Sequence, residues 1–181
     1  LERLFRRAGL ALGMSEGFHQ KPRMSFPSAL ALGIEGRDEV MELELAEPLA
    51  AEELLARLQR RTAPGLEFVS AEVLPTGARK AQLHAATYEV PLPAERLPDA
   101  AERVERLLAD SSHPIVRPHR KNAVDLRQSL EGLVLRDGVL EMRLRAEPGS
   151  AGPRDVLAAL GLGDLEREGR PLVRTRVEIL P

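Results

Sequence analysis

Residues 133–142 read Leu133-Val134-Leu135-Arg136-Asp137-Gly138-Val139-Leu140-Glu141-Met142, in which two apolar runs flank the dipeptide Asp137-Gly138. An Asp-Gly pair between two such runs is a strong signal for a two-residue β-hairpin, because the turn favours residues that tolerate a positive φ. We therefore predict a hairpin in the second half of the chain. The neighbouring elements are assigned from this hairpin.

Strand and helix patterns alternate on both sides of the predicted hairpin. Before it, residues 88–92 alternate as in a strand, and residues 98–109 carry apolar side chains at helical spacing. After it, a proline and a glycine bound a predicted helix at residues 153–161, and residues 172–180 alternate as a final strand. The second half therefore has the order β-α-β-β-α-β.

The first half repeats part of this order. Helices are predicted at residues 1–8 and 51–61, and strands at residues 24–34, 41–45 and 68–74. These elements give α-β-β-α-β, and we expect the missing opening strand to lie upstream of Leu1.

The fold predicted from these patterns is α+β, with tandem duplicated ferredoxin-like (βαββαβ) halves. The first half spans residues 1–77 and lacks its first strand, and the second half spans residues 78–181. In this topology both helices of a half lie on one face of its sheet. The other face is expected to be covered by the other half or by a partner.

Composition restricts the possible chemistry. The chain has 181 residues, of which 43% are hydrophobic, so it can bury a core. Its 26 Lys and Arg against 28 Asp and Glu give a net charge of -2, so affinity for nucleic acid or membranes has to come from local patches. The absence of cysteine excludes disulfides, thiolate nucleophiles and Cys-ligated clusters. No membrane segment is predicted, and a cytoplasmic location is expected.

A candidate substrate-binding surface lies in residues 14–26, Met-Ser-Glu-Gly-Phe-His-Gln-Lys-Pro-Arg-Met-Ser-Phe. A glycine lets a ligand approach the backbone, a histidine can transfer a proton, and lysine and arginine can bind phosphate. The alternative is a structured loop that Phe18 and Phe26 anchor in the core. The candidate residues are Ser15, Gly17, Phe18, His19, Lys21 and Arg23.

A second basic patch contains Arg117, Arg120, Lys121 and Arg127. In a duplicated fold it lies at a place partly comparable to the first patch, so the two patches are expected to line one groove. Contacts of this kind bind phosphates in a salt-sensitive and sequence-independent way, which makes RNA, either tRNA or rRNA, a candidate partner. Strand aromatics are scarce, so base stacking on a sheet is not expected.

Evidence for catalysis by the chain itself is weak. No Gly-x-Ser-x-Gly, Walker or dinucleotide-binding pattern occurs, and the spacing of His113 and His119, with Asp125 as a third ligand, matches no known metal motif. We predict no metal site. His19 remains a candidate general acid or base, and the chain is more consistent with a protein that has no catalytic activity on its own.

The sequence resembles a known family. Ser15-Glu16-Gly17-Phe18-His19-Gln20-Lys21-Pro22-Arg23-Met24-Ser25-Phe26, followed by Ala29-Leu30-Ala31-Leu32-Gly33-Ile34-Glu35, resembles the signature of the radical-SAM-linked family. These small bacterial proteins are fused to, or encoded beside, a radical S-adenosylmethionine enzyme. Residues 124–127, 137–140 and 156–162 are similar to the second half of that family. Two features depart from it, namely Gln20 in place of a usual proline and the lack of an upstream Ser-His-Leu-Asp type helix start.

This resemblance implies an accessory substrate-binding or docking module for a radical S-adenosylmethionine enzyme, and the basic patches suggest a role in RNA modification. S-adenosylmethionine and an iron–sulfur cluster are then expected on the partner, and no cofactor is expected on this chain. One alternative is an RNA-processing enzyme that uses His19 as acid or base. Another is a pure protein-interaction domain, in which the acidic strand around Glu42 and Glu44 faces a basic partner.

Overall fold

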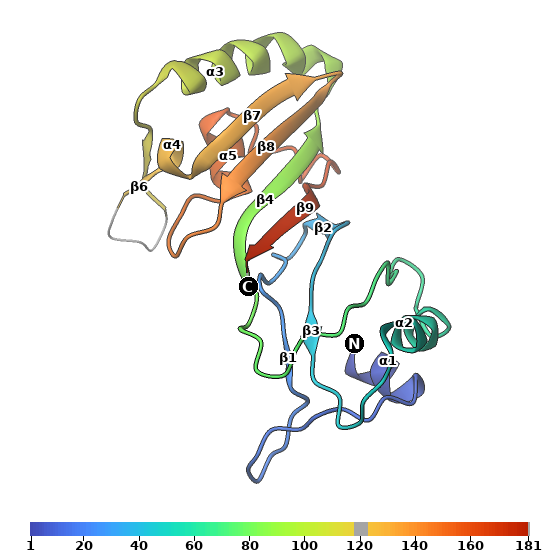
Figure 1. Cartoon of the computed structure of the whole chain (residues 1–181). Coiled ribbons are helices and arrows are strands. Elements are labelled where there is room, and N and C mark those ends of the chain that lie inside the picture. Colours follow the sequence, from blue (N-terminus) through green and yellow to red (C-terminus); the bar gives the residue numbers. More distant parts are fainter. Residues whose placement is uncertain (118–122, 181) are drawn as a thin grey trace. The chain divides into compact units, whose positions relative to one another are not determined.

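The computed structural model describes residues 1–117 and 123–180 and has two compact units (Figure 1). Unit 1 contains residues 1–27 and 41–80, and unit 2 contains residues 28–40 and 81–180. Each unit has its own apolar cluster, and each is described by itself.

Unit 2 is built on a five-stranded mixed sheet in the order β2-β9-β4-β8-β7. Its strands are β2 (Glu35–Gly36), β4 (Gln82–Pro91), β7 (Leu130–Arg136), β8 (Val139–Arg145) and β9 (Val173–Leu180). Strand β2 runs parallel to β9, and all other neighbours are antiparallel. Asp137 and Gly138, with φ of 51° and 77°, join β7 to β8, so the predicted hairpin is confirmed.

The helices of unit 2 connect these strands. They are η1 (Ala94–Arg96), α3 (Leu97–Ala109), α4 (Leu126–Ser129) and α5 (Pro153–Ala159), and the short strands β5 (Pro114–Ile115) and β6 (Val124–Asp125) pair with each other between α3 and α4. The predicted order of the second half is present as β4-α3-β7-β8-α5-β9.

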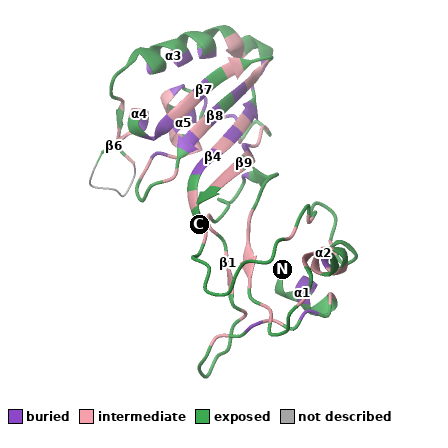
Figure 2. Ribbon diagram, viewed as in Figure 1, coloured by how far each residue is buried: buried purple, intermediate pink, exposed green. Residues whose placement is uncertain are grey.

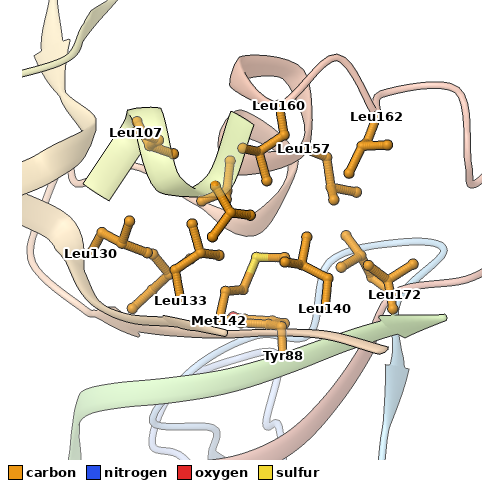
Figure 3. Close-up of a cluster of buried hydrophobic side chains, with 14 of the residues drawn as sticks. Tyr88, Leu107, Leu130, Leu133, Leu140, Met142, Leu157, Leu160, Leu162 and Leu172 are labelled. Atoms are coloured by element: carbon orange, nitrogen blue, oxygen red, sulfur yellow. The ribbon is translucent and has the colours of Figure 1, made fainter. Parts of the chain in front are cut away.

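The core of unit 2 lies between the sheet and the helices α3 and α5. Figure 3 shows Leu107 of α3 and Leu157 of α5 on the same side of the sheet as Met142 of β8. Alternate residues of β8 are buried there, with Leu140 and Met142 fully inaccessible to water. Burial of each such side chain contributes about 1.5–3 kcal/mol, so this layer dominates the stability of unit 2.

The opposite face of the sheet carries ion pairs. Arg143 of β8 binds Glu178 of β9 at 2.8 Å and also pairs with Glu131 of β7, which accepts from Arg145 at 2.8 Å. The fully buried Ala85 of β4 lies between Arg145 and Glu178 in the strand register. This face of the sheet is therefore charged, and its cover by the other half or by a partner stays a prediction.

Residues 28–40 form a strap along strand β9. Ile34 joins the core of unit 2, and β2 pairs with β9 through Glu35 N to Leu172 O at 2.9 Å. The predicted strand at residues 24–34 is therefore wrong in its extent, since only β1 (Met24–Ser25) lies within it. Pro27 cannot donate to a strand ladder, and the chain then passes from unit 1 to unit 2.

Unit 1 is smaller and has little regular structure. It contains α1 (Glu2–Arg7), β1, β3 (Glu42–Leu43) and α2 (Ala51–Gln59), with β1 and β3 antiparallel. Its core of buried residues consists of Leu4, Phe5, Leu10 and Leu58. Figure 2 shows that exposed and intermediate residues predominate outside this core.

The prediction of a duplicated ferredoxin-like arrangement is not confirmed. Within the described residues, the strands of unit 1 form only the two-stranded β1-β3 sheet, beside two isolated β-bridges, and residues 68–74 are not a strand. The apolar pattern of residues 68–74 favours a strand, but a strand also needs a neighbouring backbone, which no described segment supplies. Unit 2 alone contains an extended sheet.

Across the part of the chain that the structure describes, no helix is long and apolar enough to cross a membrane.

Candidate functional site

The candidate surface of residues 14–26 folds as a hairpin that extends from unit 1 (Figure 1, blue). We define the hairpin as residues 13–23 and its tip as residues 15–21. Met14 pairs with Pro22, and the Ser15 N–H donates to Lys21 O at 2.8 Å. The Lys21 N–H in turn donates to Ser15 Oγ at 2.9 Å, so the side chain of Ser15 helps to close the tip.

The base of the hairpin is joined to the segment around β3. The Gly13 N–H donates to Glu44 O, and the Arg23 N–H donates to Gly13 O, both at 2.8 Å. The side chain of Ser25 donates to Glu42 at 2.9 Å. Leu12, Met24, Leu43 and Leu45 pack against the core of unit 1. The hairpin therefore projects from a hydrogen-bonded and apolar base.

The tip presents two aromatic rings to solvent. Phe18 is 98% exposed, and its ring meets the ring of His19 edge to face with centroids 5.2 Å apart. Gly17, with φ of 111°, sets the turn that precedes them. Phe26 is 47% exposed, so the alternative that Phe18 and Phe26 anchor the loop in the core is wrong.

The cations of the hairpin differ in their availability. Lys21 is exposed and makes no ion pair with any described residue. Arg23 instead binds Glu44 at 3.1 Å, and both side chains are about half exposed. The carboxylate of Glu44 offsets the charge of Arg23, so Lys21 is the better placed of the two for an anionic ligand.

The second basic patch has partners within unit 2. Arg117 binds Asp155 at 2.6 Å in a half-buried ion pair, and Arg127 Nε donates to Asp110 O at 3.0 Å near the end of α3. Arg120 and Lys121 lie outside the described residues. The shared groove between this patch and the hairpin remains a prediction, because the two patches belong to different units.

Asp125 has a structural role that explains its position beside this patch. Hydrogen bonds from the His113 N–H, at 2.9 Å, and from Ser112 Oγ, at 2.7 Å, lower the pKa of its carboxyl group. It also caps α4 by accepting from the Arg127 N–H. His113 lies 3.5 Å from Asp110, and His84 is exposed on β4. Among the described residues, no group of three or more His, Asp or Glu can hold a metal ion.

Sequence reasoning missed the carboxylates that neutralise two of the chosen arginines. One alternative had Glu42 and Glu44 facing a basic partner, yet within unit 1 Glu44 binds Arg23 and Glu42 accepts from Ser25 at the β1-β3 pairing. Arg23 and Ser25 lie two residues apart in the sequence, and so do Glu42 and Glu44. This equal spacing is a signal that the side chains of the two segments pair across neighbouring strands. Asp155 has no such signal, because it lies 38 residues from Arg117.

The fold and the hairpin define an α+β protein that presents aromatic rings on an exposed tip. A family model described as an uncharacterized protein conserved in bacteria (DUF2344) matches residues 1–152. The chain belongs to this bacterial family. No curated protein and no solved structure matches the chain.

Proposed function

We propose that the chain is an accessory docking module of a radical S-adenosylmethionine enzyme and that the tip of the hairpin contacts this enzyme. The partner is supported by the resemblance of residues 15–26 and 29–35 to the radical-SAM-linked signature. Because the chain has no cysteine, S-adenosylmethionine and the iron–sulfur cluster belong to the enzyme in this proposal.

The observation that carries the docking role is the exposure of Phe18 at 98% on a hairpin with a bonded base. Aromatic side chains are enriched among the residues that dominate binding energy at protein interfaces. A hairpin whose base is held in place loses less conformational freedom on binding than a loose loop. Phe18 therefore has the chemistry of an anchor for an apolar pocket on the enzyme.

RNA delivery has less support than protein docking. Arg23, Arg117 and Arg127 are bound to acceptors within the protein. Among the described candidate residues, Lys21 is the one cation without an acceptor within the protein, and sequence-independent RNA binding needs several phosphate contacts. RNA binding is therefore the alternative that the test distinguishes from protein docking.

The test is a binding titration, under anaerobic conditions, between this protein and a radical S-adenosylmethionine enzyme of the same organism. We expect Phe18→Ser to weaken binding by at least about tenfold, as loss of an aromatic anchor does. Val69→Ser is the matched control, because Val69 is also an apolar residue of unit 1, 75% exposed, and lies outside the hairpin.

Two outcomes contradict the proposal. One is the absence of a complex with the wild-type protein, and the other is an equal loss for Phe18→Ser and Val69→Ser. A complex that disappears on nuclease treatment, together with a salt-sensitive mobility shift of tRNA or rRNA fragments, would replace protein docking by RNA binding.

A further inference from the structure

The strap pairs with strand β9 along only part of the outer edge of this strand. The Glu35 N–H donates to Leu172 O at 2.9 Å, and the bond from the Arg37 N–H to Arg174 O has the same length. Beyond Arg37, no described backbone group of the strap bonds to β9. From residue 175 onward β9 is therefore an edge strand, and the backbone groups of such an edge can pair with another chain.

One side chain of the strap covers this remaining edge. Asp38 accepts the Val177 N–H at its Oδ2 atom, at 3.0 Å. The carboxylate takes the place of the carbonyl oxygen that a neighbouring strand would supply, and a hydrogen bond to a charged acceptor is stronger than one between neutral groups. Charged side chains at sheet edges are a device by which proteins prevent edge-to-edge association. Asp38 has the position and the charge for this role.

The bend that carries Asp38 is held on both sides by Arg174. Before the bend, the carbonyl oxygen of Arg174 accepts the Arg37 N–H, and after it Glu39 accepts from Arg174 Nε at 2.7 Å. Gly36 leaves room for the bend, since a Cβ atom there would lie 2.6 Å from Cγ of Glu39. These contacts fix the place of the Asp38 carboxylate at the edge of β9.

The part of β9 that Asp38 covers is complementary to itself in the antiparallel direction. The register with β4 shifts between Arg176 and Arg174, so Thr175 is the extra residue of a β-bulge. When two copies are aligned with Val177 opposite Val177, Arg176 of each copy lies opposite Glu178 of the other. Opposite charges at directly opposed positions stabilise an antiparallel pair. In this alignment the Val177 N–H, which the strap now caps, is the central donor.

We propose that the outer edge of residues 175–179 is an interaction surface for a second copy of this chain and that Asp38 keeps it closed. Opening of the bend frees the capped N–H group, and the β9 strands of two copies then pair into one continuous sheet. A second copy is the partner because it supplies Arg176 and Glu178 in the opposite direction. Glu178 already accepts from Arg143, but each carboxylate oxygen can accept a second hydrogen bond. This inference does not depend on the proposed docking to an enzyme.

The experiment measures self-association by sedimentation equilibrium over a range of protein concentrations. We expect Asp38→Ala to have a dimer dissociation constant at least about tenfold lower than the wild type, which must first give up a charge-assisted hydrogen bond. Asp38→Asn is the matched control, because its side-chain oxygen can still accept the Val177 N–H, and it should stay close to the wild type. Asp38 is exposed, so both variants should keep the urea midpoint of the wild type.

A second substitution tests the alignment of the two strands. Adding Arg176→Glu to Asp38→Ala places like charges opposite each other and should return the dissociation constant to the wild-type value. A double variant that associates as tightly as Asp38→Ala would overturn the pairing of β9 with itself. Equal association of the wild type and Asp38→Ala, including none by either, would overturn the closing role of Asp38.

Hydrogen exchange of the Val177 amide gives an independent measurement. In dilute Asp38→Ala, where the protein is a monomer, this amide should exchange at least about tenfold faster than in the wild type, because its acceptor is missing. At high concentration the exchange should slow again as the second copy supplies a carbonyl oxygen. An exchange rate that is the same in both proteins would show that Asp38 does not protect this edge.

Discussion

Arg174 shows how a single residue can hold two distant segments together. Its side chain is 2% exposed, and its guanidinium donates to Glu39 at 2.7 Å from Nε and also to Ser28. Burial by itself would lower the pKa of Arg174, but hydrogen bonds with Glu39 and Tyr88 outweigh it and leave this pKa raised. Arg174 therefore stays charged inside unit 2, because the strap supplies the carboxylate of Glu39 as its partner.

Removal of the partner of Arg174 should release the strap. We expect Glu39→Gln to lower the free energy of unfolding by about 1–3 kcal/mol, because it leaves a buried guanidinium without a counter-charge. This loss in the free energy of unfolding is smaller than the loss expected when a fully buried ion pair is broken, because the Glu39 side chain is 32% exposed. Urea unfolding measures this change.

Arg174→Met combined with Glu39→Gln is the informative double variant. If Glu39→Gln destabilises the protein because it leaves the buried guanidinium of Arg174 unpaired, its loss in the free energy of unfolding should be smaller in the Arg174→Met background. An equal cost in both backgrounds would contradict the role assigned to this pair.

At the scale of elements, the hairpin depends on the lack of a side chain at Gly13. A Cβ atom at this position would lie 2.9 Å from Cγ of Glu44 and 3.1 Å from its Cβ. Gly13→Ala should therefore displace Glu44 and weaken its ion pair with Arg23, at a cost of about 1 kcal/mol.

The matched background for Gly13→Ala is Glu44→Ala, which removes the closest of these atoms. We expect the cost of Gly13→Ala, measured by urea unfolding, to fall by about half when Glu44 is already alanine. NMR shifts of the Ser15 and Lys21 amides should report the same change within the tip. Additive costs would show that the crowding at Glu44 is not the cause.

The sequence predicts best those elements whose conformation is set by residues that are neighbours in the sequence. Asp137-Gly138 encodes its own turn, so the β7-β8 hairpin was predictable from two residues. A strand needs a partner as well as a pattern, and for this reason residues 68–74 were predicted wrongly. The short strand β2 has little pattern of its own, since its position is set by Leu172 and Arg174 of a distant segment.

The same distinction between neighbouring and distant residues applies to the candidate site. The composition of residues 14–26 singled out the segment that forms the hairpin, and Phe18, His19 and Lys21 are exposed there, but their role in binding stays a prediction. The pairing of Arg117 with Asp155 was not predictable, because it depends on the packing of α5 beside the segment that follows β5, 38 residues away from Asp155 in the sequence. Charges counted along the sequence therefore overstate what is free to bind a ligand.

For the whole molecule, the small net charge of -2 conceals many internal ion pairs. In unit 2 the Arg143 guanidinium lowers the pKa of Glu178, and the Arg154 guanidinium lowers the pKa of Glu166. Arg96 has the same effect on the pKa of Asp164. These carboxylates bind protons less readily in the folded protein than in the unfolded chain.

The stability of the protein should therefore decrease in acid. A carboxylate with a lowered folded pKa stabilises the fold above its unfolded pKa, near 4, and this contribution is lost as the pH falls through the folded pKa. We expect the urea midpoint of the wild type to be constant above about pH 5 and to fall steadily below it. Glu178→Gln should have a lower midpoint at pH 7 and approach the wild type once the pH falls below the lowered folded pKa of Glu178, where this carboxyl group is protonated in both states. Glu141→Gln removes an exposed carboxylate on the adjacent β8 and should change the midpoint little at either pH, so a parallel loss in both variants would contradict the assignment to the Arg143 pair.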